Sequence, residues 1–188
     1  MKKILILALF PLFCLRPGVA GVKFEAGFFY GARTVRDPDI KTVYGNGTAY
    51  FPYVAAEVWK GLFLGAGYEG GYSRDGRIGL YQEPTTLKAT GFEVFVGYAF
   101  KIGIASPYLK AGFGSYSYKQ TIDSPYLQEF RVDHKKSAWT LAGGIKLFPI
   151  DKAFLAVELK YVPLKVRPFE DDVDLGGWRY QGGIGFRF

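Results

Sequence analysis

The only histidine of this 188-residue sequence, His134, is the residue whose type most directly suggests chemistry. Asp133 precedes it, and Ser137 follows three positions later. An imidazole can move a proton near neutral pH, and a neighbouring hydroxyl or carboxylate can complete a general acid–base site. His134 falls in a polar stretch between two alternating apolar segments, however. We therefore interpret it as a solvated loop histidine, and we predict no catalytic residue, no cofactor and no enzymatic activity.

A second candidate for chemistry is an acidic stretch near the end of the chain, with Glu170, Asp171, Asp172 and Asp174. Clustered carboxylate oxygens are the ligands that hard cations prefer. The stretch lacks the glycine-punctuated spacing of a calcium-binding loop. We expect a solvated loop, or loose bridging of cations to phosphate groups, and no metal site.

Composition favours a single domain built of strands. The sequence contains 25 glycines, and 18% of its residues are aromatic, a mixture that indicates many strands with close backbone approaches. The formal net charge of +7 raises the question of a nucleic-acid partner. Because no basic run or arginine-rich stretch accompanies this charge, we predict no nucleic-acid binding.

The first twenty residues have the pattern of a secretory signal peptide. Lys2 and Lys3 precede an apolar run over 4–15, and Gly18-Val19-Ala20 forms a small-x-small cleavage site. The run is too short to span a bilayer as a helix, and no later apolar stretch reaches about 18 residues. We predict residues 1–20 as the signal peptide. The remaining chain would carry a net charge of +4 and no cysteine, since Cys14 lies in the apolar run.

The last eleven residues show the clearest strand pattern. Side chains of a strand alternate between its two faces. One face would carry Trp178, Tyr180, Gly182, Ile184, Phe186 and Phe188, and the other Arg179, Gln181, Gly183, Gly185 and Arg187. The segment therefore predicts a strand that is apolar on one side and polar on the other.

Seven more segments alternate in the same way. We predict strands at about 22–34, 49–59, 62–72, 88–101, 106–118, 137–148, 153–165 and 178–188. The connections are alternately long (35–48, 73–87, 119–136, 166–177) and short (60–61, 102–105, 149–152). Transmembrane barrels show this asymmetry on an even number of strands, and their strands cross the bilayer in about 9–11 tilted residues.

The distribution of residue types between the two faces indicates which face meets lipid. One face carries Leu, Val, Ile and aromatic residues on nearly every strand, whereas the other carries glycine, alanine and single charges. Small residues suit the narrow interior of an eight-stranded barrel. We therefore predict an all-β fold, an eight-stranded antiparallel up-and-down transmembrane β-barrel over residues 21–188. We assign Tyr30, Tyr72, Trp139, Tyr161, Trp178 and Tyr180 to its interfacial aromatic girdle.

The end of the chain resembles the C-terminal signal of bacterial outer-membrane barrels. Gln181, Gly183, Phe186 and Phe188 match its pattern of a polar residue, a glycine and two hydrophobic residues. The whole pattern is similar to the small OmpA/OmpX-type barrels. The resemblance implies recognition by the barrel-assembly machinery, a location in the outer membrane with periplasmic termini, and four extracellular loops. No peptidoglycan-binding domain is expected after the barrel.

The resemblance implies a role in envelope integrity, adhesion or surface interaction. Its implied partners are outer-membrane lipid, lipopolysaccharide and an extracellular molecule bound through the loops. Two alternatives stay open. One is a lipid-modifying enzyme of the PagP or PagL type; the PagL-like pattern has histidine and serine two positions apart, not three, and omptin proteases need a longer, ten-stranded chain. The other is a soluble periplasmic lipocalin-like binding barrel.

The face that would point into the barrel gathers charged residues from most strands. These are Glu25, Glu57, Glu69, Glu93 and Glu158 with Lys23, Lys110, Lys146, Lys160, Arg179 and Arg187. Isolated buried charges cost several kcal/mol each, so we expect these groups to pair across strands. We predict Glu25 and Arg187 as neighbours and a lumen too full to conduct ions.

Overall fold

The computed structural model describes residues 22–123, 130–166 and 173–188. Its elements in chain order are β1 (Lys23–Arg33), α2 (Pro38–Tyr44), β2 (Gly47–Trp59), β3 (Leu62–Ile78), β4 (Glu83–Ala99), β5 (Ala105–Ile122), β6 (Phe130–Ile150), β7 (Ala153–Val162), β8 (Lys165–Val166), β9 (Val173–Asp174) and β10 (Gly177–Arg187). Eight of the strands form a closed barrel, and β8 and β9 form a separate two-stranded sheet.

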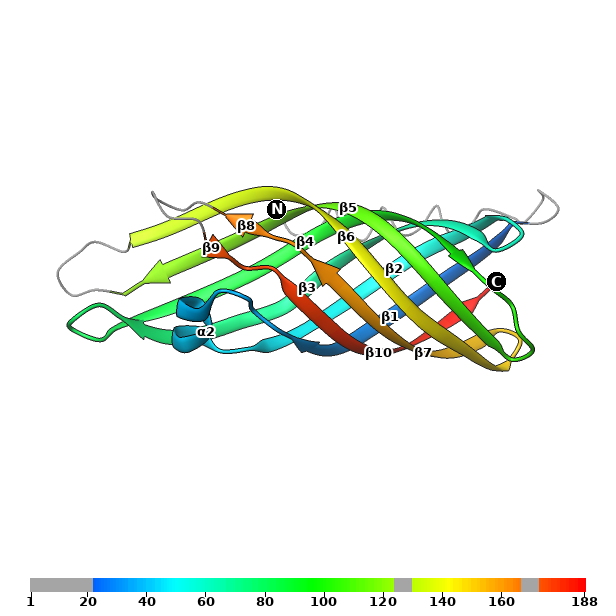
Figure 1. Ribbon diagram of the computed structural model, residues 1–188, viewed down its shortest axis with the longest axis horizontal. Coiled ribbons are helices and arrows are strands. Elements are labelled where there is room, and N and C mark those ends of the chain that lie inside the picture. Colours follow the sequence, from blue (N-terminus) through cyan, green and yellow to red (C-terminus); the bar gives the residue numbers. More distant parts are fainter. Residues whose placement is uncertain (1–21, 124–129, 167–172) are drawn as a thin grey trace, which may run out of the picture.

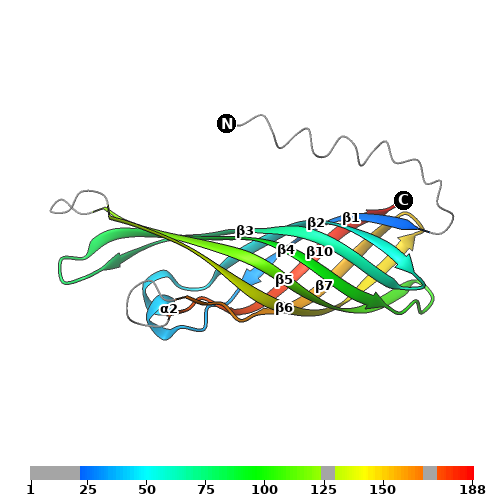
Figure 2. The ribbon, with the colours of Figure 1, turned by 90° about the horizontal axis from the view of Figure 1, so that it is seen from above.

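The barrel has the up-and-down topology that the alternation predicts. Around it the strands run in the order β1-β10-β7-β6-β5-β4-β3-β2, and each pairs antiparallel with its neighbours. The last strand closes on the first, with a register from Glu25↔Arg187 to Arg33↔Arg179. The tilted strands leave α2, β8 and β9 at one end, the helix end, and the C-terminus and three short turns at the other, the turn end (Figures 1 and 2).

Two of the predicted long loops are mostly strand. β3 continues to Ile78 and pairs with β4 from Glu83, and β5 and β6 pair out to Ile122 and Phe130. The predicted boundaries at 73–87 and 119–136 were therefore wrong. Outside the lipid layer neither face of a strand needs to be apolar, so the alternation that marks the barrel strands disappears. The turn residues 79–82 provide the positive φ values of Gly79 and Gln82.

The first predicted loop contains the helix α2. Asp37 is its N-cap and accepts hydrogen bonds from the backbone N–H groups of Asp39 and Ile40, while Pro38 begins the helix. This combination is a common helix start, although we predicted residues 35–48 only as a long connection. Within the described residues, no helix is long and apolar enough to cross a membrane. The predicted fourth loop starts earlier than expected, because β7 ends at Val162.

The outer face of the barrel is apolar. The exposed side chains of its strands include Leu64, Phe92, Val94, Val96, Leu109, Phe113, Leu141, Leu155, Val157 and Ile184. On the helix-end side aromatic rings contact one another along this face, as in Tyr161–Trp178 with centroids 4.9 Å apart. Tyr72 was wrongly assigned to this girdle. It is buried inside, because the irregular register between Glu69 and Tyr72 changes the face on which β3 presents it.

Two clusters of buried hydrophobic residues fill the interior. One lies in the barrel and contains Phe29, Phe51, Tyr53, Ala55, Phe63, Phe95, Tyr108, Phe154 and Ala156. The sequence led us to expect mainly small residues there. Glycines make room for these rings on neighbouring strands: a Cβ on Gly183 would collide with Phe29, and one on Gly185 with Phe154.

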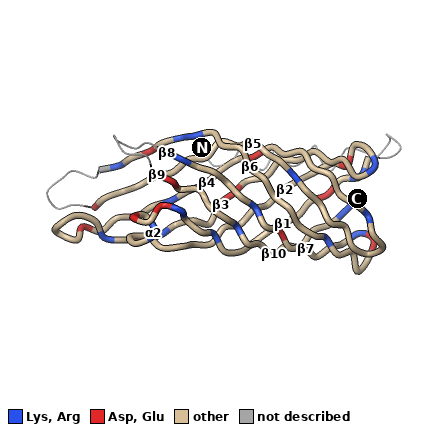
Figure 3. The backbone as a smooth tube through the Cα atoms, viewed as in Figure 1, with Lys and Arg blue, Asp and Glu red and all other residues tan. Residues whose placement is uncertain are grey.

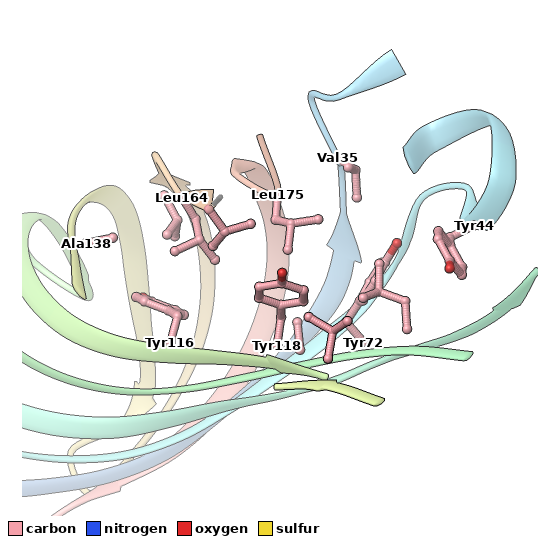
Figure 4. Packing of buried hydrophobic residues seen from close by; sticks show 13 residues of the cluster. Val35, Tyr44, Tyr72, Tyr116, Tyr118, Ala138, Leu164 and Leu175 are labelled. Atoms are coloured by element: carbon pink, nitrogen blue, oxygen red, sulfur yellow. The ribbon is translucent and has the colours of Figure 1, made fainter. Parts of the chain in front are cut away.

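The second cluster closes the helix end. Val35, Leu164 and Leu175 pack there with Tyr72, Tyr116 and Tyr118 beside Tyr44 of α2 (Figure 4). The Tyr44 hydroxyl lies 2.9 Å from Thr85 Oγ1 and accepts a hydrogen bond of 2.8 Å from Gln120 Nε2. The strand extensions, α2 and the described residues Leu164, Val166 and Leu175 therefore cover the helix end of the lumen.

Candidate functional site in the barrel lumen

The first group of charges in the lumen surrounds Glu69 of β3. Arg179 donates to its Oε1 atom from Nε and Nη2, at 3.2 and 3.1 Å. Lys160 Nζ lies 3.1 Å from Oε2, and Arg33 Nη1 lies 3.7 Å from Oε1. Each of these four side chains is at most 2% exposed. One buried carboxylate therefore faces three cations from β1, β7 and β10.

Lys160 links this group to Glu93 of β4. Its Nζ atom lies 2.6 Å from Glu93 Oε2 and 4.1 Å from the centroid of the Phe51 ring. The Tyr116 hydroxyl donates to the same carboxylate oxygen at 3.0 Å. Lys160 thus bridges Glu69 and Glu93 in the half of the lumen nearer the helix end.

A second group lies among the lumen aromatics. Lys110 Nζ is 2.6 Å from Glu158 Oε2, and the Tyr108 hydroxyl donates to that oxygen at 2.7 Å. Four rings surround the ammonium, with centroids between 4.8 and 5.8 Å away: those of Phe29, Phe51, Tyr53 and Phe95. Aromatic faces attract cations, so the rings stabilise the buried charge together with its carboxylate partner.

A third group lies at the turn end. Glu25 binds Lys146 through Oε2 and Arg187 through Oε1, with Arg187 Nη2 at 2.6 Å and Nε at 3.0 Å. Arg187 also stacks over Phe148, 4.1 Å from the ring centroid. Charged positions are consequently spread along the barrel (Figure 3).

Not every residue that we predicted for the lumen network lies in it, and one further residue does. Glu57 is half-buried beside a turn, where it accepts a hydrogen bond of 3.1 Å from the Gly61 backbone N–H, and Lys23 is exposed. Arg33, which we did not assign to the network, is buried in it; its position on the inner face of β1 was the available signal. Gln181 of the predicted assembly signal also points inward and is buried, whereas Phe186 and Phe188 are exposed.

The charge balance differs from the five acids and six bases that we predicted. The described ion pairs in the lumen involve Glu25, Glu69, Glu93 and Glu158 with Arg33, Lys110, Lys146, Lys160, Arg179 and Arg187. Cations therefore outnumber carboxylates, and two of the carboxylates are shared between cations. Sharing keeps every cation within reach of a negative charge.

The other candidate residues do not assemble a catalytic site. His134 faces inward and stacks on Tyr118 with centroids 5.7 Å apart, whereas Ser137 is opposite Ser115 on the outer face of β6. Asp133 faces outward and binds Lys119 Nζ at 3.2 Å, which lowers the pKa of its carboxyl. The histidine therefore points to the face of the strand opposite to that of the serine and the aspartate.

The predicted acidic cluster lies mostly outside the described residues, which include only Asp174 of its four members. Asp174 lies 3.7 Å from Arg36 and accepts a hydrogen bond from the Gly176 backbone N–H. Among the residues that the structure describes, no group of three or more His, Cys, Asp or Glu side chains could hold a metal ion.

Comparison with known proteins agrees with this architecture. The family model of the outer membrane protein beta-barrel domain matches residues 5–188. The chain belongs to this family. It is an outer-membrane barrel, so the soluble lipocalin-like alternative was wrong. The family match, the closed barrel and the apolar outer face agree with one another.

Solved structures share the fold of this barrel at low sequence identity. Ail of Yersinia pestis, in complex with the heparin analogue sucrose octasulfate, has a TM-score of 0.61 and 13% identity, with 89% of this chain and 99% of that chain covered. Neisserial surface protein A has a TM-score of 0.59 and 12% identity, with 90% and 98% covered. The N-terminal barrel domain of Pseudomonas aeruginosa OprF has a TM-score of 0.54 and 15% identity, with 89% of this chain and 96% of that chain covered. No curated protein matches the sequence.

The filled lumen predicts that the barrel does not conduct. Rings and ion pairs fill it from Glu25 at the turn end to Glu69 nearer the helix end. The second apolar cluster closes the helix end itself. We expect planar bilayers containing the purified protein to show no steady single-channel current. Large and stable current steps from the pure protein would contradict a plugged barrel and indicate a pore.

Proposed function

We propose that this chain is a non-enzymatic outer-membrane anchor that presents its helix end outside the cell for surface interaction. The observation that carries the proposal is the extension of β3, β4, β5 and β6 beyond the other strands at that end (Figure 2). Both terminal strands begin or end at the turn end, where Phe24 and Phe188 exchange backbone hydrogen bonds. Because an exported chain would enter the outer membrane from the periplasm, we expect the turn end, with both termini, to face the periplasm.

The extended sheet has one edge covered by α2 and one edge that is open among the described residues. α2 covers β3: the Tyr72 hydroxyl donates to Gly45 O at 3.1 Å, and a Cβ on Gly76 would meet Val43. On the opposite side β6 pairs with β7 only from Leu141 onward, so from Phe130 to Thr140 its sole described strand partner is β5.

An open edge is a template for pairing with another extended segment. The exposed residues along this part of β6 include Arg131, Lys135 and Lys136 against Asp133. Charged side chains discourage nonspecific pairing of edges. A basic edge would favour an extended partner with acidic side chains, and we propose such a segment as its ligand.

The outer face of the same extension supports contact with lipopolysaccharide. Lys88 of β4 lies directly opposite Lys119 of β5, above the lipid-facing Phe92 on the same face. Ammonium groups next to an apolar band favour anionic headgroups. We therefore propose lipopolysaccharide phosphates as neighbours of this surface, with outer-membrane lipid around the barrel.

Surface labelling of intact cells tests the proposed orientation. A membrane-impermeant amine reagent should modify Lys135 and Lys136 at the helix end but spare Lys60 and Lys101 at the turn end. Mass spectrometry of the purified protein would locate the modified lysines, and lysed cells provide the control in which both sets react. Labelling of Lys60 and Lys101 alone in intact cells would reverse the orientation.

The signal peptide leads to a prediction for processing. We propose residues 1–20 as the signal peptide, and we expect cleavage after Ala20 because Gly18-Val19-Ala20 has the small-x-small pattern. N-terminal sequencing of the protein from outer membranes should begin at Gly21. A mature N-terminus before about residue 18 would contradict the assignment.

A further prediction concerns assembly. We propose Gln181, Gly183, Phe186 and Phe188 as the signal for the assembly machinery. Deletion of Phe188 should lower the amount of folded protein in the outer membrane, because it removes the exposed apolar residue that follows β10. Heat-modifiable migration in SDS gels measures the folded fraction. Replacement of the equally outward Ile184 by valine is the control, and equal folded levels for both variants would contradict the prediction.

A further inference from the structure

The three short turns of the barrel repeat one combination of residues. Each carries a lysine, Lys60, Lys101 or Lys152, and each lysine is exposed. Beside them, Trp59 is 66% exposed, Ile102 is 65% exposed and Ile150 is 63% exposed. A large apolar side chain therefore lies within two positions of a cation in each turn.

Two of these turns have tight backbone geometry. In the first turn, Lys60 and Gly61 have φ values of 31° and 94°. In the second, Ile102 and Ala105 exchange backbone hydrogen bonds of 2.8 and 2.9 Å around Gly103. The chain reverses within a few residues at both turns, and Trp59 and Ile102 are exposed there.

The length of the apolar face places the turns at the edge of the lipid layer. The outward residues run from Phe92 and Val96 on β4 through Phe100, just after the strand, to Ile102 in the turn. At about 3.3 Å per residue and a tilt of about 40°, the ten steps from Phe92 to Ile102 rise about 25 Å. The apolar band of such barrels is about 25 Å tall. If Phe92 lies at the boundary on the helix-end side, Ile102 therefore lies at the boundary on the turn-end side.

The charge at this boundary is mainly positive. The acidic residues of the turns are Glu57, which accepts a hydrogen bond from the Gly61 backbone, and Asp151 next to Lys152. Nearby, Lys146 and Arg187 share the single carboxylate of Glu25. Lys60 and Lys101 have no acidic neighbour among the ion pairs of the described residues. At the helix end, by contrast, exposed cations such as Lys119 and Arg36 face Asp133 and Asp174.

We propose that the three turns lie in the headgroup layer of the inner leaflet and bind the phosphates of anionic phospholipids. The inference rests on the proposed membrane anchor. Trp59, Ile102 and Ile150 enter the boundary of the acyl chains, and the neighbouring lysines extend their stems along it to reach phosphate oxygens. The apolar residues set the depth of the turns, and the lysines select the charge of the lipid.

Spin-labelled lipids measure this selection directly. The folded protein is reconstituted in phosphatidylcholine vesicles, and the motionally restricted fraction of spin-labelled phosphatidylglycerol is compared with that of spin-labelled phosphatidylcholine. We expect the protein to prefer phosphatidylglycerol about three-fold, as several lysines near a headgroup layer imply. The variant K60Q/K101Q/K152Q should bring the ratio close to one. The control K41Q/K135Q/K165Q removes the same charge from exposed positions at the helix end that lie away from the apolar band, and it should retain the preference.

Each outcome has a separate meaning. Equal restriction of both lipids by the native protein, or an equal loss in the control variant, would overturn the inference. No restricted lipid of either kind would show that the chain does not span the bilayer, and the proposed anchor itself would fail. If the triple variant does not fold in a heat-modifiability assay, K101Q alone should still lower the ratio. Cosedimentation of the detergent-solubilised protein with cell-wall sacculi, lost in the turn variant only, would assign the lysines to the cell wall and overturn the lipid proposal.

Discussion

Replacement of Glu69 by alanine is expected to lower the free energy of unfolding by about 3–5 kcal/mol, because it leaves buried cations without their counter-charge. Glu69 contacts Arg33, Arg179 and Lys160, and all four side chains are almost fully buried. Lys160 would retain Glu93, but the two guanidinium groups would lose their only carboxylate among the described ion pairs. A urea titration of the folded protein in vesicles, followed by tryptophan fluorescence, measures the loss.

The matched control is an exposed ion pair of the same barrel. Asp133 binds Lys119 at 3.2 Å, and both side chains are at least 40% exposed. Exposed pairs contribute about 0–1 kcal/mol, so Asp133→Ala should leave the transition almost unchanged. If Glu69→Ala also cost less than about 1 kcal/mol, water would have to enter the lumen and screen the cations, and the plugged interior would be wrong.

The alternation of apolar and polar residues predicted the barrel, because contact with lipid imposes this alternation on each strand. Every transmembrane strand must be apolar outside, so the period of two in segments such as 178–188 indicated the strands, their inward faces and the order of the short turns. The same parity was sufficient to assign residues such as Glu93 and Lys160 to one lumen. The short turns were predictable for a related reason, since only a few polar or glycine residues interrupt two apolar patterns.

Other features had no such constraint. Beyond the lipid the extensions of β3 and β6 lose their alternation, and the Asp37-Pro38 helix start resembles a turn. The filling of the lumen was not predictable because Phe51 and Phe95 occur at inward positions of strands whose outward positions are also aromatic or aliphatic. Which side chain pairs with which depends on register around the whole barrel: Lys146 and Glu25 are 121 positions apart in the chain.

The seam that closes the barrel leads to the second large effect. Gly31 of β1 faces Gln181 of β10, and a Cβ on Gly31 would overlap the backbone carbonyl of Tyr180 and approach Gln181 Cα. These are backbone atoms of the closing strand, so no rotamer change can relieve the overlap. We expect Gly31→Ala to destabilise the barrel by about 3 kcal/mol, the upper part of the range for overpacked sites. Urea titration in vesicles measures the loss, and heat-modifiable migration reports any failure to close.

Gly182 provides a control on the same seam. It lies opposite Tyr30, one position away from the pair of Gly31 and Gln181, and a Cβ there would meet no heavy atom within 4 Å. Gly182→Ala changes the same group of atoms but points outward, and alanine lowers the entropy of the unfolded chain. Its stability should equal that of the native protein or exceed it by about 0.5 kcal/mol. If the Gly31→Ala and Gly182→Ala variants were equally stable, β1 and β10 would have to separate locally. The seam would then be flexible, and the tight closure described from Glu25 to Arg33 would be wrong.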